Sequence, residues 1–236
     1  MRKIELKHNF RVLDSGLNSD RVIFVFTAMG TSIQHYRLFL KLLQRKGYDT
    51  IIYDYPTGLV LDARFDEWAE LYQNIATDAR DRMRIRKKQG STKFFVYGVS
   101  MGTLLANRFV RETPDINHII ISLTYGDVAD HIMHSPATQK TRHAMKAKGI
   151  TYEYLRKMSR PFDPVQNAKG LAGKKVLLHL SKKDKVLNYD MTRMTKEALQ
   201  RAGVDMQYTE SKNLGHYGAG AKHMLQISRI DNFFKS

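Results

Sequence analysis

Residues Gly98-Val99-Ser100-Met101-Gly102 place a serine between two glycines, at the junction of a predicted strand and a predicted helix. The preceding residues 93–97 form the apolar, β-branched and aromatic run that is typical of a buried strand, and residues 103–110 have helical periodicity. A serine at such a sharp turn is presented above the sheet, and the glycines let the helix pass close to the strand. The chain is therefore expected to contain a strand–turn–helix unit that exposes Ser100 as a candidate nucleophile.

The same alternation of strand and helix runs along most of the 236 residues. Apolar runs predict strands at 3–13, 21–27, 50–55, 93–97, 119–123, 175–180 and 204–209. Helical periodicity predicts helices at 36–43, 65–88, 103–110, 189–202 and 219–234. Alternating elements with continuously apolar strands predict an α/β fold, in which a mostly parallel central sheet carries helices on both faces.

The alternation stops between about 126 and 170, where the sequence is polar, contains several methionines and has helical stretches at 139–148 and 152–158. We interpret this segment as a small helical cap inserted into a single domain, 1–236, above the C-terminal edge of the strands, where α/β sheets place their binding crevices. Its side chains either line an apolar pocket or pack the cap, and the candidates are Tyr125, His131, Met133, His134, Met145, Tyr154 and Met158. The two histidines have no third ligand nearby, so we expect neither a metal nor a cofactor.

A serine hydroxyl is a weak nucleophile and requires a base, which in turn requires a group that orients it. His216 is the candidate base, because histidine titrates near neutrality and this residue follows the last predicted strand on a glycine-flanked loop. Asp184 is the candidate acid, because it follows the predicted strand 175–180. Asp127 is the competing acid, just after the strand ending near residue 123, and Asp190 is a weaker third candidate because it falls within the following helix.

The chain order Ser100, Asp184, His216, with each residue at a strand exit, resembles the α/β-hydrolase fold superfamily of small serine esterases, lipases and thioesterases. The resemblance covers nearly the whole chain. It implies that Ser100 is the nucleophile and that His216 is the general base and then the general acid. It also implies that Asp184 orients the histidine and stabilises its charged form.

The same resemblance implies an oxyanion hole made of two backbone N–H groups. One belongs to Met101, the residue after the nucleophile, and the other to the loop after an earlier strand. Aligning Gly30 with the later glycine of the family's loop assigns this second donor to Ala28, with Met29 as the alternative. The sequence departs from the family here, because Phe26-Thr27 stands where His-Gly is usual.

The formal net charge is +16, and a basic surface attracts nucleic acids, acidic membranes and anionic substrates alike. The densest basic run is Arg80, Arg82, Arg84, Arg86, Lys87 and Lys88, at the end of a predicted helix. Alternate positions spread around a helix, so we expect a solvated helix end with favourable charge near its C-terminus. Because no base-stacking or groove-reading motif accompanies the charge, nucleic-acid binding is not predicted.

The chain contains no cysteine, which removes disulfides, thiolate metal sites and cysteine nucleophiles together. Residues 1–8 carry charges where a signal peptide needs an apolar core, and no apolar run approaches the length of a membrane span. A cytoplasmic location is therefore expected.

Three functions fit these features. The first is hydrolysis of a small carboxylic ester through an acyl-Ser100 intermediate. The second uses the same residues on a thioester of coenzyme A or a carrier protein, because the basic surface attracts anions. The third is a non-catalytic scaffold of the same fold that binds an acidic partner through its charge. The presence of all three triad residue types favours the enzymes.

Overall fold

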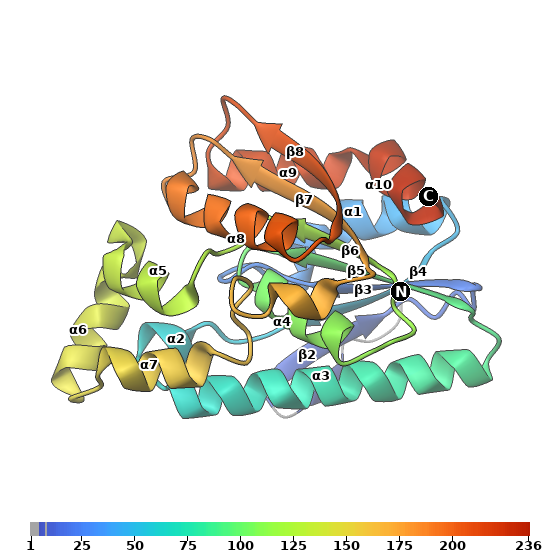
Figure 1. Cartoon of the computed structure of the whole chain (residues 1–236). Coiled ribbons are helices and arrows are strands. Elements are labelled where there is room, and N and C mark those ends of the chain that lie inside the picture. The colour runs from blue at the N-terminus through green and yellow to red at the C-terminus, as the bar shows by residue number, and fades with distance from the viewer. Residues whose placement is uncertain (1–4, 8) are drawn as a thin grey trace.

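The computed structural model describes residues 5–7 and 9–236, which form one sheet of eight strands flanked by helices (Figure 1). The strands are β1 Glu5–Lys7, β2 Phe10–Asp14, β3 Arg21–Phe26, β4 Asp49–Asp54, β5 Lys93–Val99, β6 His118–Ser122, β7 Lys175–Ser181 and β8 Asp205–Ser211. Their order across the sheet is β1-β2-β4-β3-β5-β6-β7-β8. Strand β2 pairs antiparallel with β1 and β4, and the remaining pairs are parallel, which confirms the predicted α/β fold.

Helices cover both faces of the sheet, as predicted (Figure 1). They are α1 Ile33–Arg45, α2 Gly58–Leu61, α3 Phe65–Lys88, α4 Gly102–Arg111, α5 Val128–His134, α6 Gln139–Ala147, α7 Tyr152–Ser159, α8 Tyr189–Arg201, α9 His216–Leu225 and α10 Ile227–Lys235, with 3-10 turns at Pro136–Thr138 and Ala168–Leu171. In β3, Ile23 and Val25 pack with α1 and α10, whereas Phe24 and Phe26 pack with α3 and α4, because successive strand residues point to opposite faces. In the described part of the chain, no helix combines the length and the apolar character needed to cross a membrane.

Two predicted elements are each divided in the structure. The strand expected at 3–13 is a hairpin of β1 and β2, because Asn9 adopts a φ of 67° and turns the chain back. Residues 1–4 and 8, which include part of that predicted strand and of the charged N-terminal segment, lie outside the described residues. The helix expected at 219–234 is two helices, α9 and α10, because Gln226 has a ψ of 51°, outside the helical region.

The segment 126–170 folds into α5, α6 and α7, which lie together at the left of Figure 1, near the C-terminal ends of the parallel strands. Helix α5 contacts the loop after β7, where the Ser135 hydroxyl donates a hydrogen bond to the Val186 carbonyl oxygen at 3.1 Å. Helix α7 packs against α3. The segment therefore sits over the end of the sheet where the candidate site residues emerge.

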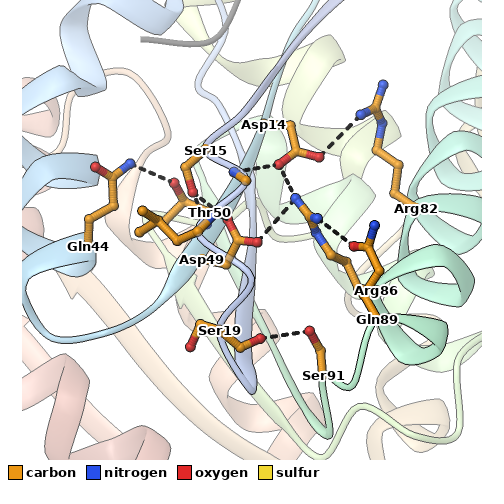
Figure 2. A network of polar contacts seen from close by, with 12 residues as sticks. Asp14, Ser15, Ser19, Gln44, Asp49, Thr50, Arg82, Arg86, Gln89 and Ser91 are labelled. Carbon is orange, nitrogen blue, oxygen red and sulfur yellow. Dashed lines mark hydrogen bonds and ion pairs between the residues drawn. The ribbon is translucent and has the colours of Figure 1, made fainter.

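The basic run at the end of α3 is solvated only in part. Its residues Arg84, Lys87 and Lys88 are exposed, as expected, but two of its arginines are buried. Arg82 and Arg86 are one turn apart and therefore share a face of α3, and they are only 9% and 4% exposed. The Arg86 guanidinium contacts the carboxylates of both Asp14 and Asp49 (Figure 2), and its distance from the Asp49 carboxylate is 3.1 Å. The guanidinium of Arg82 donates a 2.7 Å hydrogen bond to Asp78. Because Asp14 and Asp49 belong to β2 and β4, this buried ion network ties α3 to the sheet.

Candidate active site

Ser100 occupies the turn between β5 and α4 and is 4% exposed. Its φ of 50° lies in the left-handed region, which is the strained backbone expected at this kind of turn. A Cβ atom on Gly102 would lie 2.6 Å from the carbonyl oxygen of Thr27, and one on Gly98 would lie 2.7 Å from the Cβ atom of Ala106. Both glycines are therefore needed for α4 to pass this close to the strands.

The structure brings the three predicted residues into one hydrogen-bonded chain. Nε2 of His216, the first residue of α9, lies 3.1 Å from Oγ of Ser100, and its Nδ1 lies 2.7 Å from Oδ2 of Asp184. All three side chains belong to buried residues. Asp184 is fixed by the loop that follows β7, because its Oδ1 accepts the backbone N–H groups of Val186 and Leu187, both at 2.9 Å.

The electrostatics of Asp184 keep it ionised. Burial opposes its charge, but the hydrogen bond from His216, the electrostatic attraction of His216 and the two backbone N–H groups outweigh burial, so the pKa of Asp184 lies below its ordinary value. An ionised carboxylate at Nδ1 makes Nε2 the acceptor that faces the Ser100 hydroxyl. The arrangement can therefore withdraw the serine proton.

The two competing aspartates serve other elements. Asp127 caps α5, where its carboxylate accepts the N–H of Asp130 at 3.1 Å and the side-chain amide of Gln166 at 3.2 Å. Asp190 lies in the first turn of α8, where its side chain is 85% exposed and pairs with Arg193. Neither carboxylate is hydrogen-bonded to His216 within the described residues, so Asp184 is the partner of that imidazole.

The loop after β3 contains the two residues, Ala28 and Met29, that the sequence offers as the second backbone donor. The backbone N–H of Ala28 donates a 2.8 Å hydrogen bond to the Tyr36 hydroxyl, so it is not free to bind an oxyanion. The Thr31 N–H closes a turn on the Ala28 carbonyl oxygen at 3.3 Å, and Gly30 provides the φ of 74° that this turn requires. Met29 lies inside the turn, and among the described residues its N–H and that of Met101 have no acceptor. Of the two residues that the sequence offers, Met29 and not Ala28 therefore has an unengaged N–H in this loop.

Comparison with known proteins decides the family. Residues 18–147, more than half of the chain, match the family described as serine aminopeptidase, S33. The chain belongs to this family. It is accordingly a serine hydrolase of the α/β-hydrolase fold. No curated protein matches the sequence.

Solved structures show the same fold as this S33-family hydrolase. Acylaminoacyl peptidase from Pyrococcus horikoshii is similar over 96% of this chain, with a TM-score of 0.71 and 17% identity, but this chain spans only 39% of that one. An esterase of Pyrococcus furiosus gives a TM-score of 0.64 and 16% identity over 96% of this chain and 86% of that one. Acetyl xylan esterase 1 from Thermoanaerobacterium gives a TM-score of 0.65 and 14% identity over 93% of this chain and 80% of that one. At these identities the likeness establishes the fold alone.

A small apolar cavity lies beside the two free backbone donors of this S33-family hydrolase. Its volume is about 30 Å³, which is space for about two water molecules. It is bounded by Met29, Val60, Leu61, Trp68, Met101, Leu104, Tyr125, Val128, Ile132, Ala137, Thr138 and Thr141. Within residues 5–7 and 9–236, no three histidine, aspartate or glutamate side chains are grouped to hold a metal ion.

Most of the candidate pocket residues from the sequence pack rather than line this cavity. Met145 is buried in the apolar core, Met133, Tyr154 and Met158 pack against that core, and His134 is exposed. Tyr125 does line the cavity, and the imidazole of His131 packs edge-to-face on its ring with centroids 4.7 Å apart. Val60 and Leu61 of α2 and Trp68 of α3 also line it but were not anticipated, because helices 32 to 40 residues before the nucleophile carry no local signal of contact with it.

Proposed function

We propose that this chain hydrolyses carboxylic esters through an acyl-Ser100 intermediate. The observation that carries the proposal is the continuous chain of hydrogen bonds from Ser100 through His216 to Asp184, next to two unengaged backbone N–H groups. Ser100 is the nucleophile, His216 the general base and acid, and Asp184 the group that orients the imidazole. The N–H groups of Met29 and Met101 form the oxyanion hole.

In the first half of the reaction, Oγ of Ser100 attacks the ester carbonyl carbon while its proton moves to Nε2 of His216. The carbonyl oxygen becomes an oxyanion that accepts from the two N–H groups. When the tetrahedral intermediate collapses, the bond from carbon to the alcohol oxygen breaks, and His216 returns the proton to the departing alcohol. Water then attacks the acyl-serine by the same route, releasing the acid and restoring the Ser100 hydroxyl.

The apolar cavity supports a short acyl group as the substrate's acyl part. Its volume of about 30 Å³ leaves little room beyond an acetyl-sized group, and residues of the segment 126–170 form part of its wall. Among the described residues that bound it, none carries a carboxylate that could bind the protonated amino group of a peptide. This lining favours esters over the amino-terminal peptides that the family description suggests.

The test compares purified protein with its Ser100→Ala variant on p-nitrophenyl acetate, on p-nitrophenyl esters of longer acids and on alanine p-nitroanilide. We expect turnover of the acetate ester, weaker turnover as the acyl chain lengthens, little on the anilide, and none with Ser100→Ala. Equal turnover by both proteins would exclude the mechanism. If a fluorophosphonate probe also fails to label Ser100, the non-catalytic scaffold becomes the better explanation.

A second candidate is hydrolysis of thioesters on an anionic carrier, and one group of charges favours it. Lys183 and Lys185 flank Asp184 on the loop after β7. Lys212 follows β8, on the loop that leads to His216. These three lysines are exposed. Positive charge beside the site raises the encounter rate of an anion, and salt screens this effect. We expect kcat/KM for acetyl coenzyme A to fall with added salt, while kcat/KM for the uncharged acetate ester stays constant.

A further inference from the structure

The hydroxyl of Thr141 is buried without a hydrogen-bond partner. Thr141 belongs to α6 in the segment 126–170 and is 1% exposed, and its Oγ1 forms no hydrogen bond within the described residues. A threonine in a helix commonly donates to the carbonyl oxygen one turn earlier, which here belongs to Ala137, but this bond is not formed. Because a buried hydroxyl without a partner is unfavourable, Thr141 is a candidate to bind a group from outside the chain.

Thr141 bounds the apolar cavity beside the candidate oxyanion hole, together with Met29 and Met101. Its side chain has only a hydroxyl and a methyl group beyond Cβ, so a threonine in the cavity wall holds its hydroxyl at that wall. Thr138 also bounds the cavity, but the hydroxyl of Thr138 donates a 2.7 Å hydrogen bond to the Ile132 carbonyl oxygen. The fold therefore uses the Thr138 hydroxyl and leaves that of Thr141 available.

The position of Thr141 is fixed by contacts between the cap helices. The guanidinium of Arg142, the next residue, donates to the carbonyl oxygens of Ile132 at 3.0 Å and Ser135 at 2.6 Å, which ties α6 to the end of α5. The Ser135 hydroxyl in turn donates to the Val186 carbonyl oxygen on the loop after β7. These contacts place the Thr141 hydroxyl before any ligand binds, so little conformational freedom is lost on binding.

The apolar cavity has room for about two atoms beyond an ester carbonyl. When the carbonyl oxygen of a bound ester accepts from the N–H groups of Met29 and Met101, its acyl chain is placed next to the cavity that the same two residues bound. The volume of about 30 Å³ holds about two non-hydrogen atoms. A methylene group followed by an oxygen atom fills this space, within a wall that includes Thr141.

We propose that Thr141 selects a short acyl group that ends in an oxygen atom, of which glycolyl is the simplest, by hydrogen bonding to that oxygen. A threonine hydroxyl both donates and accepts, so it can bind a hydroxyl or an ether oxygen. A propionyl group has the same size but ends in a methyl group, so its binding leaves the buried Thr141 hydroxyl unpaired. This inference deepens the proposed function and rests on it, because it requires an acyl-Ser100 intermediate.

The test compares phenyl glycolate with phenyl propionate, on the parent protein and on Thr141→Val. Valine keeps the shape of threonine and removes the hydroxyl. We expect the ratio of kcat/KM for the glycolate to kcat/KM for the propionate to fall about 10- to 100-fold in Thr141→Val, as for loss of a hydrogen bond to a buried group. The intrinsic reactivities of the two esters cancel when the two proteins are compared, and an unchanged ratio would overturn the proposal.

The matched control is Thr113→Val. Thr113 follows α4, at the end of that helix opposite Ser100, and it is also buried with no hydrogen bond to its Oγ1 from the described residues. This variant should keep the ratio of the parent protein, and an equal fall in both variants would indicate a general effect of removing a buried hydroxyl and overturn the proposal.

Thr141→Ser tests whether the hydroxyl or the methyl group of Thr141 is responsible. Serine keeps the hydroxyl, so the ratio should stay within about threefold of that of the parent protein. A ratio as low as that of Thr141→Val would assign the preference to packing and contradict the proposal. Should Thr141→Val not fold, the parent protein alone provides the test: its ratio should exceed the ratio of the hydroxide rate constants of the two esters by about tenfold or more, and equal ratios would exclude the role of Thr141.

Two further outcomes separate this inference from the function on which it rests. If Ser100→Ala is inactive on both esters but Thr141→Val keeps the preference of the parent protein, only the role of Thr141 fails. If Ser100→Ala hydrolyses both esters as fast as the parent protein does, the proposed function fails as well.

Discussion

Oδ2 of Asp184 lies 2.7 Å from Nδ1 of His216, and Oδ1 of the same carboxylate accepts two backbone N–H groups. The carboxylate is therefore bound on both oxygens, one by the imidazole and the other by its own loop. The imidazole can neither rotate nor exchange its tautomer without breaking a buried hydrogen bond of a charged group. This restraint leaves Nε2 as the acceptor for the Ser100 proton.

The first prediction concerns Asp184→Asn. An amide at this position presents an N–H group to Nδ1, so His216 is held in the tautomer that cannot accept the Ser100 proton. We expect kcat for p-nitrophenyl acetate to fall about 10⁴-fold, as for the corresponding change in other triads, while the protein stays folded. Steady-state kinetics and circular dichroism measure the two quantities.

Asp127→Asn is the control for this prediction. Because Asp127 caps α5, the variant should keep kcat within threefold and lose at most about 1 kcal/mol of unfolding free energy. The reverse pattern, with Asp184→Asn active and Asp127→Asn inactive, would assign the triad acid to Asp127.

The positions of Ser100, Asp184 and His216 could be predicted from the sequence because each follows a predicted strand. Parallel strands end at the same edge of a sheet, so three residues that follow three such strands are brought together even when more than 80 positions separate them in the chain. The donor in the loop after β3 could not be predicted in this way. The choice between Ala28 and Met29 depends on the Tyr36 hydroxyl, which reaches the loop from the first turn of α1.

The interpretation of the basic run at the end of α3 was wrong for Arg82 and Arg86 for a related reason. Its charges alone suggest a solvated surface, but the carboxylates that pair with the buried Arg86 belong to Asp14 in β2 and Asp49 in β4, which lie 72 and 37 positions earlier in the chain. Nothing in the sequence near Arg86 identifies those partners. Strand order is likewise invisible locally, because apolar runs show which residues are buried and not which strands are neighbours.

The second prediction concerns the oxyanion hole. A phosphonate bound to Ser100 imitates the tetrahedral intermediate, and its free oxygen occupies the oxyanion position. In a crystal structure of this adduct, that oxygen should lie about 2.7–3.1 Å from the backbone nitrogens of Met29 and Met101. The Ala28 N–H should keep its hydrogen bond to Tyr36. A phosphonate oxygen bound by Ala28, with the Tyr36 contact broken, would restore the donor expected from the sequence.

The third prediction concerns Gly102→Ala. The added methyl group would collide with the backbone of Phe26 and Thr27, which cannot rotate away as a side chain could. We expect poor folding or a loss of several kcal/mol of unfolding free energy, measured by denaturant titration. Gly218→Ala is the matched control in α9, where the nearest atom would be 3.6 Å away. The unfolding free energy of Gly218→Ala should be unchanged or slightly higher than that of the parent protein. An equal loss of unfolding free energy in both variants would contradict the steric explanation.

The fourth prediction concerns Arg86→Met. The substitution removes the positive charge shared by Asp14 and Asp49 and leaves the fully buried Asp49 carboxylate without its ion pair. We expect unfolding free energy to fall by about 3–5 kcal/mol in denaturant titration. Arg84→Met, on the exposed face of the same helix, should change it by no more than about 0.5 kcal/mol. Equal effects would mean that the buried network contributes nothing beyond helix propensity.

The fifth prediction concerns pH and the stacked imidazoles of His179 and His223. Their rings are parallel within 5° and 4.3 Å apart, and both residues are buried, so a proton on either ring is unfavourable. Burial, followed by the positive charges of Arg229 and Lys222, lowers the pKa of His179 to about 4, and burial lowers the pKa of His223 as well. The unfolded chain binds protons near pH 6.5, where the native state does not, so stability should fall as the pH drops from about 6.5 toward 4.

The lowered pKa of His179 alone should make the unfolding free energy about 2 kcal/mol smaller at pH 5 than at pH 7.5. Urea titrations at the two pH values measure the difference directly. His179→Gln lacks the titrating ring, so the difference should shrink by about the same amount, whereas His143→Gln, at an exposed position of α6, should leave it unchanged. An equal pH dependence in the parent protein and His179→Gln would mean that the stacked pair takes up protons without unfolding, and that the acid sensitivity arises elsewhere.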